Sequence, residues 1–320
     1  ATTKLTVSKE WSGLSQANAN EQSVTVKLFK NGVATTQEKI LDKDNNFKAT
    51  FDNLPDTDAV NGVNTKNVYT VKEVDADGNA LNAGDKIKLG DKEFVVSYDG
   101  AKVKNTLVNP EIKLEGKKIW NDANDQDGIR PDEVTVRLIA NGIDTGKTTK
   151  ATKLGNWEYK FENLAKYDAN GDEIVYSVVE IGVPGYTAEI NGTTITNTHD
   201  PAKIDIPVKK IWNDDNDAKG KRPQSVHITL FADGVKADEV DLNAGDNWAH
   251  TFANMPKFKD GKLIKYTVKE DAVASYESKI TGDETEFQVT NTYKEPVKPN
   301  GGKKGGKPNT FDDGGMALYS

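Results

Sequence analysis

The sequence predicts an all-β protein: three tandem two-sheet β-sandwich domains followed by a flexible tail. Short alternating segments end in Asn-Gly and Asp-Gly turns, and no segment sustains the 3.6-residue period of a helix. One unit recurs three times along the 320 residues. The 35% hydrophobic content and the 27 glycines suit exposed strands joined by many turns better than helical bundles or membrane spans.

The three copies occupy residues 1–108, 109–200 and 201–294, and we expect each to be one domain. Each copy opens with a strand that ends in Lys-x-Trp: VSKEW at 7–11, GKKIW at 116–120 and VKKIW at 208–212. A polar loop follows, and then an alternating strand closed by a glycine turn: VTVKLFKNG from Val24, VTVRLIANG from Val134 and VHITLFADG from Val226. These turns predict tight hairpins.

Three further strands complete each copy. The first carries an aromatic residue: NFKATFDNL to Leu54, NWEYKFENL to Leu164 and NWAHTFANM to Met255. The second ends in glutamate: YTVKE at 69–73, YSVVE at 176–180 and YTVKE at 266–270. The third contains asparagine: VKNT from Val103, ITNT from Ile195 and VTNT from Val289. Copy 1 has an insertion between its glutamate and its asparagine, which predicts an extra hairpin there.

The recurring lysine, glutamate and asparagine are predicted to face the cores, because side chains two apart in a strand share a face. Lys9, for example, shares its face with Val7 and Trp11. The same alternation holds for all nine residues: Lys9, Lys118 and Lys210; Glu73, Glu180 and Glu270; Asn105, Asn197 and Asn291.

Burying an ammonium, a carboxylate and an amide in a small core is costly, because desolvation can outweigh the attraction between the charges. Desolvation favours a neutral lysine, which is a nucleophile, and a protonated glutamate. The acid can hydrogen-bond to the asparagine carbonyl and carry protons to departing ammonia. Strands that hold the groups in contact supply effective molarities of roughly 10⁵ M or more. We therefore predict an autocatalytic Lys-Asn amide, formed once per domain.

The segments GKKIWNDANDQDGIRP and VKKIWNDDNDAKGKRP, with the YTVKE and VTNTY strands, resemble the Cna B-type domains of Gram-positive collagen adhesins and related surface proteins. The resemblance covers about residues 1–294. It implies an inverse immunoglobulin-like β-sandwich whose first and last strands are joined by an intramolecular isopeptide bond. Carried across by motif, the bonds are Lys9 to Asn105 with catalytic Glu73, Lys118 to Asn197 with Glu180, and Lys210 to Asn291 with Glu270. Copy 1 departs from the motif in its loop, which lacks the Asp-rich stretch and the Arg-Pro.

A different interpretation of the nine residues is that each lysine extends its ammonium from a strand end to solvent while glutamate and asparagine bond nearby. Asp122, Asn124 and Asp127 suggest a calcium loop, but their spacing does not fit an EF-hand, and turn capping is the preferred interpretation. The three histidines lie in unrelated contexts and support no hydrolytic triad. We expect the five tryptophans to be core anchors, and neither a cofactor nor a metal is predicted.

Residues 295–320 are rich in Pro, Gly and Lys and are predicted to form a flexible tail. Within this tail, Pro308, Asn309 and Thr310 resemble part of a sortase sorting motif, with Lys307 and Phe311 as departures from it. A plain linker is the alternative. The sequence does not begin with Met, and we interpret it as a mature protein or an excised piece.

The expected function is that of a structural stalk or spacer of an extracellular, cell-wall-anchored adhesin, not of a turnover enzyme. We expect a host matrix or cell-surface ligand to bind a region N-terminal to this chain, and sortase and peptidoglycan to be partners of the tail. A monomer is expected. With a net charge of -8 and no basic stripe, nucleic acid is not a partner, and the absence of cysteine excludes disulfides. The alternatives are a module that binds a host ligand directly and a pilin subunit, although no Tyr-Pro-Lys pilin motif is present.

Overall fold

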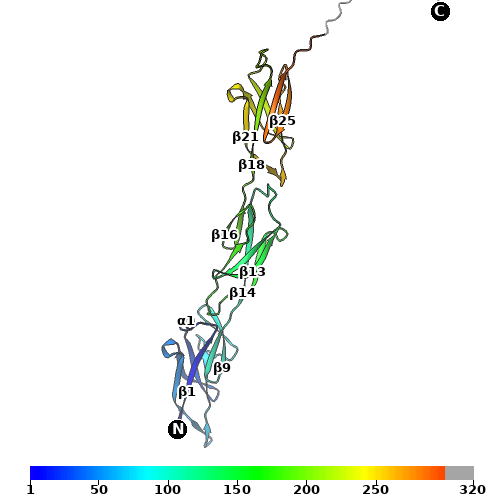
Figure 1. Cartoon of the computed structure of the whole chain (residues 1–320). Coiled ribbons are helices and arrows are strands. Elements are labelled where there is room, and N and C mark those ends of the chain that lie inside the picture. Colours follow the sequence, from blue (N-terminus) through cyan, green and yellow to red (C-terminus); the bar gives the residue numbers. More distant parts are fainter. Residues whose placement is uncertain (300–320) are drawn as a thin grey trace, which may run out of the picture. The chain divides into compact units, whose positions relative to one another are not determined.

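The computed structural model describes residues 1–299, whose regular secondary structure is nearly all strand (Figure 1). Each repeat forms its own pair of sheets around its own apolar cluster, so the predicted all-β sandwich class is confirmed. The chain packs as two compact units, one of residues 1–121 with 131–198 and one of residues 122–130 with 199 onward. Within residues 1–299 no helix is long and apolar enough to cross a membrane.

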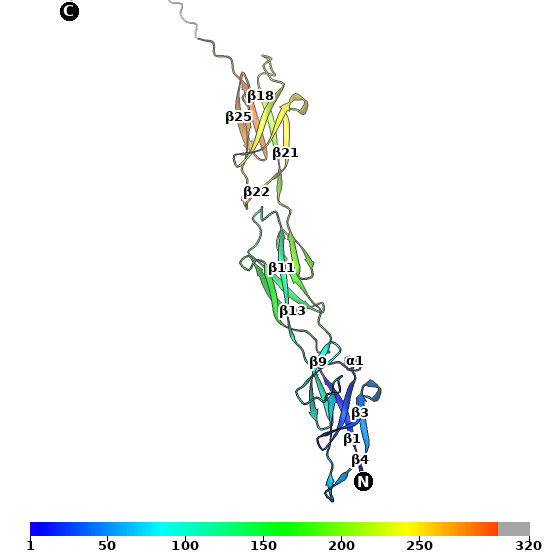
Figure 2. The same cartoon turned by 180° about the vertical axis from the view of Figure 1, so that it is seen from behind.

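The first repeat has a five-stranded sheet in the order β4 (Lys48–Pro55), β1 (Thr2–Ser12), β10 (Lys102–Leu107), β9 (Lys92–Asp99) and β8 (Lys86–Leu89) (Figure 2). Its second sheet has the order β3 (Val33–Leu41), β2 (Val24–Lys30) and β7 (Tyr69–Val74). The remaining elements are the hairpin β5 (Thr57–Val60) and β6 (Val63–Lys66), the 3₁₀ turn η1 (Lys43–Asn45) and the helix α1 (Gln16–Ala19). The core lies between the two sheets and contains Val7, Phe51, Val26 and Leu28.

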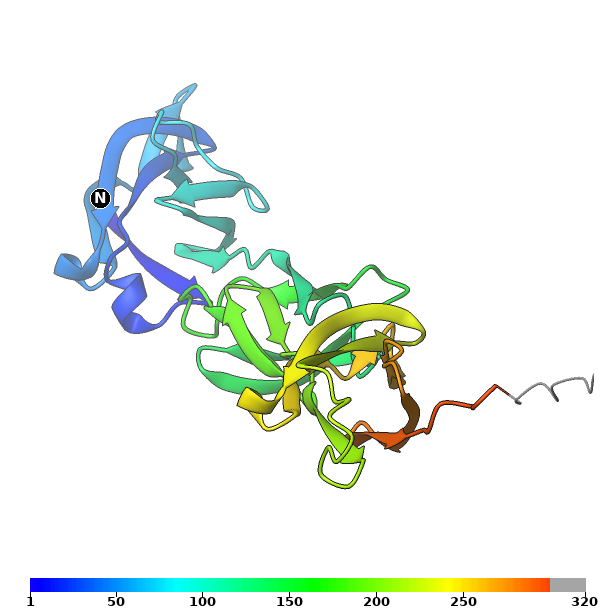
Figure 3. The same ribbon diagram turned by 90° about the horizontal axis from the view of Figure 1, so that it is seen from above.

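The insertion of repeat 1 forms the predicted hairpin from β8 and β9. Only β8 is additional, because β9 pairs with the last strand as the equivalent strand does in the other repeats. The polar loop after β1 contains a feature that we did not predict, the short helix α1, seen as a coil beside the end of β1 (Figure 3). Ser15 caps this helix by accepting a hydrogen bond from the Asn18 N–H at 3.2 Å.

The second and third repeats have the same plan without the extra strand. Repeat 2 has a sheet of β14 (Glu158–Ala165), β11 (Glu111–Asn121), β17 (Thr194–Thr198) and β16 (Thr187–Asn191), and a sheet of β13 (Ile143–Thr152), β12 (Glu133–Ala140) and β15 (Tyr176–Glu180). Repeat 3 has a sheet of β21 (Ala249–Pro256), β18 (Lys203–Asn213), β26 (Glu286–Tyr293) and β25 (Tyr276–Asp283), and a sheet of β20 (Val235–Asn243), β19 (Ser225–Ala232) and β24 (Tyr266–Glu270). Repeat 3 also has η2 (Ala244–Asp246) and the hairpin β22 (Phe258–Lys259) and β23 (Lys262–Leu263).

In every repeat the first and last strands are parallel neighbours in the larger sheet: β1 with β10, β11 with β17, and β18 with β26. Parallel neighbours cannot be joined by a tight turn, so the rest of the repeat forms the connection between them. The chain therefore enters and leaves each sandwich along two adjacent strands. The recurring lysine lies on the first of these strands and the recurring asparagine lies on the last.

Repeats 1 and 2 share a hydrogen-bonded junction inside the first compact unit. The Ser15 N–H donates to Asn170 O at 2.9 Å, and Asn18 Nδ2 donates to Asp172 Oδ1 at 2.9 Å. Asn109 exchanges two hydrogen bonds with the backbone of Tyr167, at 3.0 and 2.9 Å. The helix α1 and the link between the repeats thus contact one turn of repeat 2.

Repeat 2 has a glycine opposite a large aromatic residue, two positions before its recurring lysine, where repeat 1 has two side chains of intermediate and small size. Gly116 lies opposite Tyr159 in the register, where repeat 1 has Val7 opposite Ala49. Tyr159 is buried, and its hydroxyl donates to Thr193 O. A Cβ placed on Gly116 would overlap the Tyr159 ring and the Thr193 carbonyl, so the absence of a side chain there makes room for the tyrosine.

We expect Gly116→Val to lower the free energy of unfolding of repeat 2 by about 1–3 kcal/mol, since overpacking displaces Tyr159 and its hydrogen bond. Urea unfolding followed through the tryptophans of repeat 2 measures the change. Adding Tyr159→Ala, the pairing of repeat 1, is expected to recover part of the loss. A Gly116→Val protein as stable as the wild type would contradict this packing account.

Candidate functional site

The lysine and the asparagine of each repeat project from the same face of one sheet. In the parallel registers, Lys9 lies level with Val103 and Trp11 level with Asn105. The equivalent pairs are Lys118 with Ile195 and Trp120 with Asn197 in repeat 2, and Lys210 with Val289 and Trp212 with Asn291 in repeat 3. The asparagine is thus a diagonal neighbour of the lysine, within reach of its long side chain.

The glutamate comes from the opposite sheet. Glu73, Glu180 and Glu270 lie on β7, β15 and β24, where they pair with Val26, Val136 and Ile228. The three groups therefore meet across the core. All nine side chains that we predicted to point inward are buried: Lys9, Lys118, Lys210, Glu73, Asn105, Asn197 and Asn291 as whole residues, and Glu180 and Glu270 with side chains that are 2% and 1% exposed.

Repeat 2 brings the three groups together most completely. Asn197 Nδ2 donates to Glu180 Oε1 at 2.7 Å, while Lys118 Nζ lies 3.5 Å from Glu180 Oε2. One carboxyl group thus contacts both the amine and the amide. The lysine also donates to the backbone carbonyl of Ile119 at 3.2 Å.

Repeat 1 has the direct contact between asparagine and glutamate, and repeat 3 has the direct contact between lysine and glutamate. In repeat 1, Asn105 Nδ2 donates to Glu73 Oε1 at 3.0 Å. In repeat 3, Lys210 Nζ lies 3.3 Å from Glu270 Oε2 and donates to Val289 O at 3.2 Å. The same three residue types occupy the same register positions throughout.

Burial favours the neutral forms of Lys9, Lys210 and Glu73. It lowers the pKa of Lys9 to about 7 and the pKa of Lys210 to about 8, although the nearby Glu73 and Glu270 carboxylates act in the opposite direction. Burial also raises the pKa of the Glu73 carboxyl. The Lys9 and Lys210 amines therefore lose a proton more readily than an exposed lysine does, and the uncharged amine is the form that can attack an amide.

The recurring tryptophan on the lysine strand covers the amine. The Nζ atoms of Lys9, Lys118 and Lys210 lie 4.1, 4.2 and 4.3 Å from the ring centroids of Trp11, Trp120 and Trp212. Each tryptophan packs against its own core cluster, as expected for a core anchor. The ring face limits where the amine can lie, and so helps to keep it beside the carboxyl group.

The amide oxygens of the three asparagines are left unsatisfied. Within residues 1–299, Asn105 Oδ1, Asn197 Oδ1 and Asn291 Oδ1 are buried and have no hydrogen-bond partner. An unpaired buried carbonyl is costly. Turning the amide over about its Cβ–Cγ bond would bring this oxygen to the glutamate, which in its protonated form would donate to it and polarise the carbonyl carbon. The arrangement can therefore serve a condensation between amine and amide.

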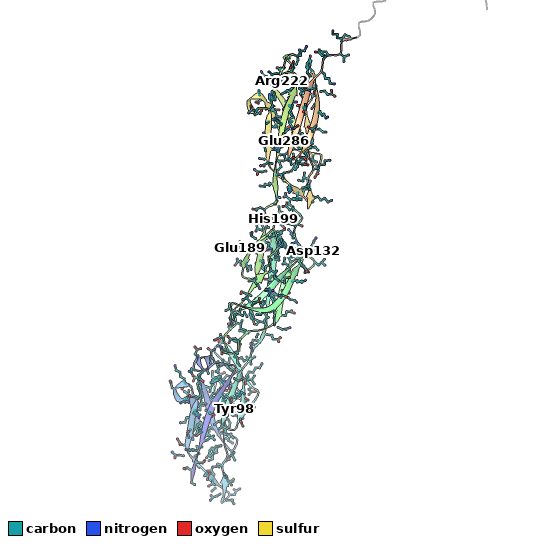
Figure 4. The ribbon with its side chains drawn as sticks, in the orientation of Figure 1. Tyr98, Asp132, Glu189, His199, Arg222 and Glu286 are labelled. Atoms are coloured by element: carbon teal, nitrogen blue, oxygen red, sulfur yellow. The ribbon has the colours of Figure 1, made fainter. Side chains whose placement is uncertain are left out.

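Three features of the site were not predicted. Arg222 (Figure 4) forms a two-pronged ion pair with the buried Asp214, at 3.1 and 2.6 Å, with its guanidinium 5.1 Å from the Trp212 ring. This hydrogen bond lowers the pKa of Asp214 to about 2. Arg130 and Asp122 form the same pair in repeat 2, at 3.0 and 2.6 Å. The recurring Asp-x₇-Arg spacing was the available sequence signal.

The second unpredicted feature belongs to repeat 1 alone. Tyr98 (Figure 4), on β9, accepts a hydrogen bond from the Glu73 N–H at 2.9 Å and donates to Leu81 O at 2.6 Å. It ties the insertion to the strand that carries Glu73, a residue that is fully buried. The third feature is the positive φ of the aromatic residues Phe47, Trp157 and Trp248, which directly precede β4, β14 and β21.

Two of the three candidates for a calcium loop have other partners. Asp122 pairs with Arg130, and its Oδ1 caps the turn by accepting from the Asp125 N–H at 3.0 Å. Asp127 Oδ2 lies 2.7 Å from His199 Nε2 and accepts from the Ala202 N–H at 2.8 Å. Asp122 thus caps a turn, whereas Asp127 bonds to residues far away in the sequence. The sorting-motif residues Pro308, Asn309 and Thr310 lie outside the described residues.

The sequence of this chain matches the sequence pattern of a known protein family in all three repeats. The family described as "Cna protein B-type domain" matches residues 5–106, 114–198 and 206–292. A collagen adhesin of Staphylococcus aureus is 35% identical over 307 residues, which are 93% of this chain and 24% of that protein. The chain thus spans about a quarter of the length of this relative.

Two solved structures of the collagen-binding protein of Staphylococcus aureus are also similar. The structure of two B repeat units is 32% identical, with a TM-score of 0.44, and the match covers 92% of this chain and 76% of that one. The structure of a single B repeat unit is 39% identical, with a TM-score of 0.29, covering 58% of this chain and all of that one.

Proposed function

Because this chain belongs to the family of Cna protein B-type domains, we propose that it is a structural stalk of a surface adhesin, stabilised by one self-formed Lys-Asn isopeptide bond in each repeat. The observation that carries the proposal is the threefold recurrence of a buried lysine, glutamate and asparagine at matched positions of the sandwich. One buried set of this kind could arise by chance. Three sets at the same register positions indicate a common function, because burying these groups is costly.

The proposed reaction is a transamidation that needs no other reactant. The neutral amine of the lysine attacks Cγ of the asparagine, a C–N bond forms, and the bond from Cγ to Nδ2 breaks. The glutamate donates a proton to the amide and receives one from the attacking amine, so the released group leaves as ammonia. Glu73, Glu180 and Glu270 are regenerated, but each lysine is consumed, so each domain reacts once. We propose no turnover activity.

The bond would close a loop over almost the whole repeat. The enclosed loop of about 80–100 residues corresponds to about 4–5 kcal/mol, on the chain-entropy estimate for a cross-link of this length. The bond would also change the path that a pulling force takes through the domain. A load that enters along the first strand would cross the bond to the adjacent last strand and bypass the rest of the sandwich.

The stalk role also sets the proposed location and partners. We propose that the protein is extracellular and anchored to the cell wall through the 307–311 segment, with sortase and peptidoglycan as partners. A relative that is a collagen adhesin supports a host matrix ligand, which we assign to a region outside this chain. We propose that the stalk itself is a monomer.

The proposal is tested by the intact mass of the purified chain. Each bond releases one ammonia, about 17 Da, so three bonds predict a mass roughly 51 Da below that of the sequence. Peptide mapping is expected to recover three branched peptides that join the strand pairs β1 and β10, β11 and β17, and β18 and β26. A chain with the full sequence mass after folding would overturn the cross-link assignment.

A further inference from the structure

In every repeat, two consecutive residues with left-handed backbone directly precede one strand of the larger sheet: β4, β14 or β21. The pairs are Asn46 and Phe47 (φ 53° and 55°), Asn156 and Trp157 (φ 55° and 60°), and Asn247 and Trp248 (φ 57° and 56°). Asparagine tolerates this conformation, but a bulky aromatic residue rarely adopts it. A strained backbone that is repeated three times at the same place points to a function for the strained residue.

The aromatic residue of each pair is held through both of its backbone polar groups. Its N–H donates to the carbonyl of the residue five positions earlier, Asp42, Thr152 or Asn243, at 2.7, 2.8 and 3.0 Å. Its carbonyl accepts from the N–H of the cross-linking lysine: Lys9 to Phe47 at 2.9 Å, Lys118 to Trp157 at 2.8 Å and Lys210 to Trp248 at 2.8 Å. In this strained conformation, the carbonyl of the aromatic residue points toward the backbone N–H of the cross-linking lysine.

The ring of the same residue contacts the tryptophan that covers the amine. Ring centroids lie 6.1 Å apart for Phe47 and Trp11, 5.1 Å for Trp157 and Trp120, and 5.2 Å for Trp248 and Trp212, all edge to face. The aromatic residue thus contacts the Lys-x-Trp segment twice. Its carbonyl fixes the lysine backbone, and its ring fixes the indole over which Nζ lies.

We propose that Phe47, Trp157 and Trp248 are positioning residues for the cross-linking reaction. This inference rests on the proposed function. The lysine stem has four methylene groups, so its amine reaches the asparagine in only a few of its many conformations. A ring that locks the indole removes the alternatives, and near-attack geometry of this kind dominates the rate of an intramolecular condensation.

The test follows bond formation in repeat 3 during synthesis of the full chain in a cell-free system. Samples are denatured in acid at intervals and digested, and the branched peptide that joins Lys210 to Asn291 is quantified. Repeats 1 and 2 of the same molecule react independently and serve as internal controls for synthesis and chemistry. Trp248→Gly removes the ring while glycine accepts the positive φ without strain. Trp248→Phe installs the ring that repeat 1 uses.

We expect Trp248→Gly to slow bond formation in repeat 3 by about 10- to 100-fold and Trp248→Phe to restore most of the rate. A purely structural role would act through unfolding. The folded fraction is therefore measured separately, in the non-reacting Glu270→Gln background with and without Trp248→Gly, by hydrogen exchange of β26. The expected result is a folded repeat 3 in both.

A wild-type rate in Trp248→Gly, or a loss that equals the unfolded fraction, would overturn the positioning role. Failure of the proposed function is distinguishable from this outcome, because then repeats 1 and 2 would form no branched peptide even in the wild-type chain.

Discussion

Replacing Glu270 by glutamine is expected to leave repeat 3 without its cross-link while repeats 1 and 2 react normally. Glutamine has nearly the same shape but cannot take a proton from the amine or give one to the leaving amide. The nucleophile itself is not lost. The Glu270 carboxylate opposes the lowering of the Lys210 pKa by burial, so its removal lowers that pKa further and increases the neutral amine. Loss of the bond would therefore isolate the proton-transfer role of Glu270.

The measurement is the intact mass together with the branched peptide of repeat 3. The expected mass lies about 17 Da above that of the wild type after correction for the substitution, and the branched peptide disappears. Glu286→Gln is the matched control, because it makes the same charge change at an exposed position of β26 in the same repeat (Figure 4). Complete ammonia loss from repeat 3 in Glu270→Gln would contradict the assignment of the acid.

Loss of the bond is also expected to lower the free energy of unfolding of repeat 3 by about 4–5 kcal/mol, since the loop of its unfolded chain is no longer closed. This is a large part of the roughly 5–15 kcal/mol typical of a domain. Urea unfolding of Glu270→Gln and Glu286→Gln measures it, and we expect only the first to shift the midpoint.

Under tension from its two ends, the wild-type chain is expected to show no unfolding of its three sandwiches. The first and last strands are parallel neighbours, so force enters one strand at its beginning and leaves the other at its end. Hydrogen bonds alone would let these strands shear apart. A covalent bond between them carries the load, and the loop that it encloses stays folded.

Single-molecule pulling compares the wild type with the triple variant Glu73→Gln, Glu180→Gln and Glu270→Gln. Each unlocked repeat is expected to release about 260–360 Å of chain, because about 80–100 residues extend at roughly 3.3–3.6 Å each. The wild type is expected to lack these steps. Unfolding steps of that length in a wild-type chain with the full ammonia loss would contradict the proposed load path.

Most of the fold and the membership of the site could be predicted from local pattern. The alternation around Lys9, Glu73 and Asn105 indicated buried side chains, because a strand has a strict two-residue period. The positive φ of Trp248 was not predicted, since the carbonyl of Trp248 accepts from Lys210, which lies on a strand far away in the sequence. The NF, NW and NW pairs before the three strands were visible, but their meaning depends on what lies opposite them.

The helix α1 was missed for a related reason. The loop that contains it reads as polar turn residues, and its hydrogen bonds to Asn170 and Asp172 involve a distant turn. The extra strand β8 was predicted as half of a hairpin, whereas the hydrogen bonds that the Tyr98 hydroxyl makes with the Glu73 N–H and the Leu81 carbonyl were not. Local periodicity predicts which face of a strand a side chain lies on. It does not predict contacts between residues that are about 25 or more positions apart in the sequence.

Spacing along the chain is enough to predict the all-β class, the threefold repeat and the nine polar residues that point inward. Spacing does not show that Lys210 and Asn291 lie on one sheet and Glu270 on the other, which becomes visible only in the folded domain. The same is true of the contacts that Trp248 makes with the Lys210 backbone and the Trp212 ring. Pairing between strands depends on the packing of the whole core, and no short segment contains that information.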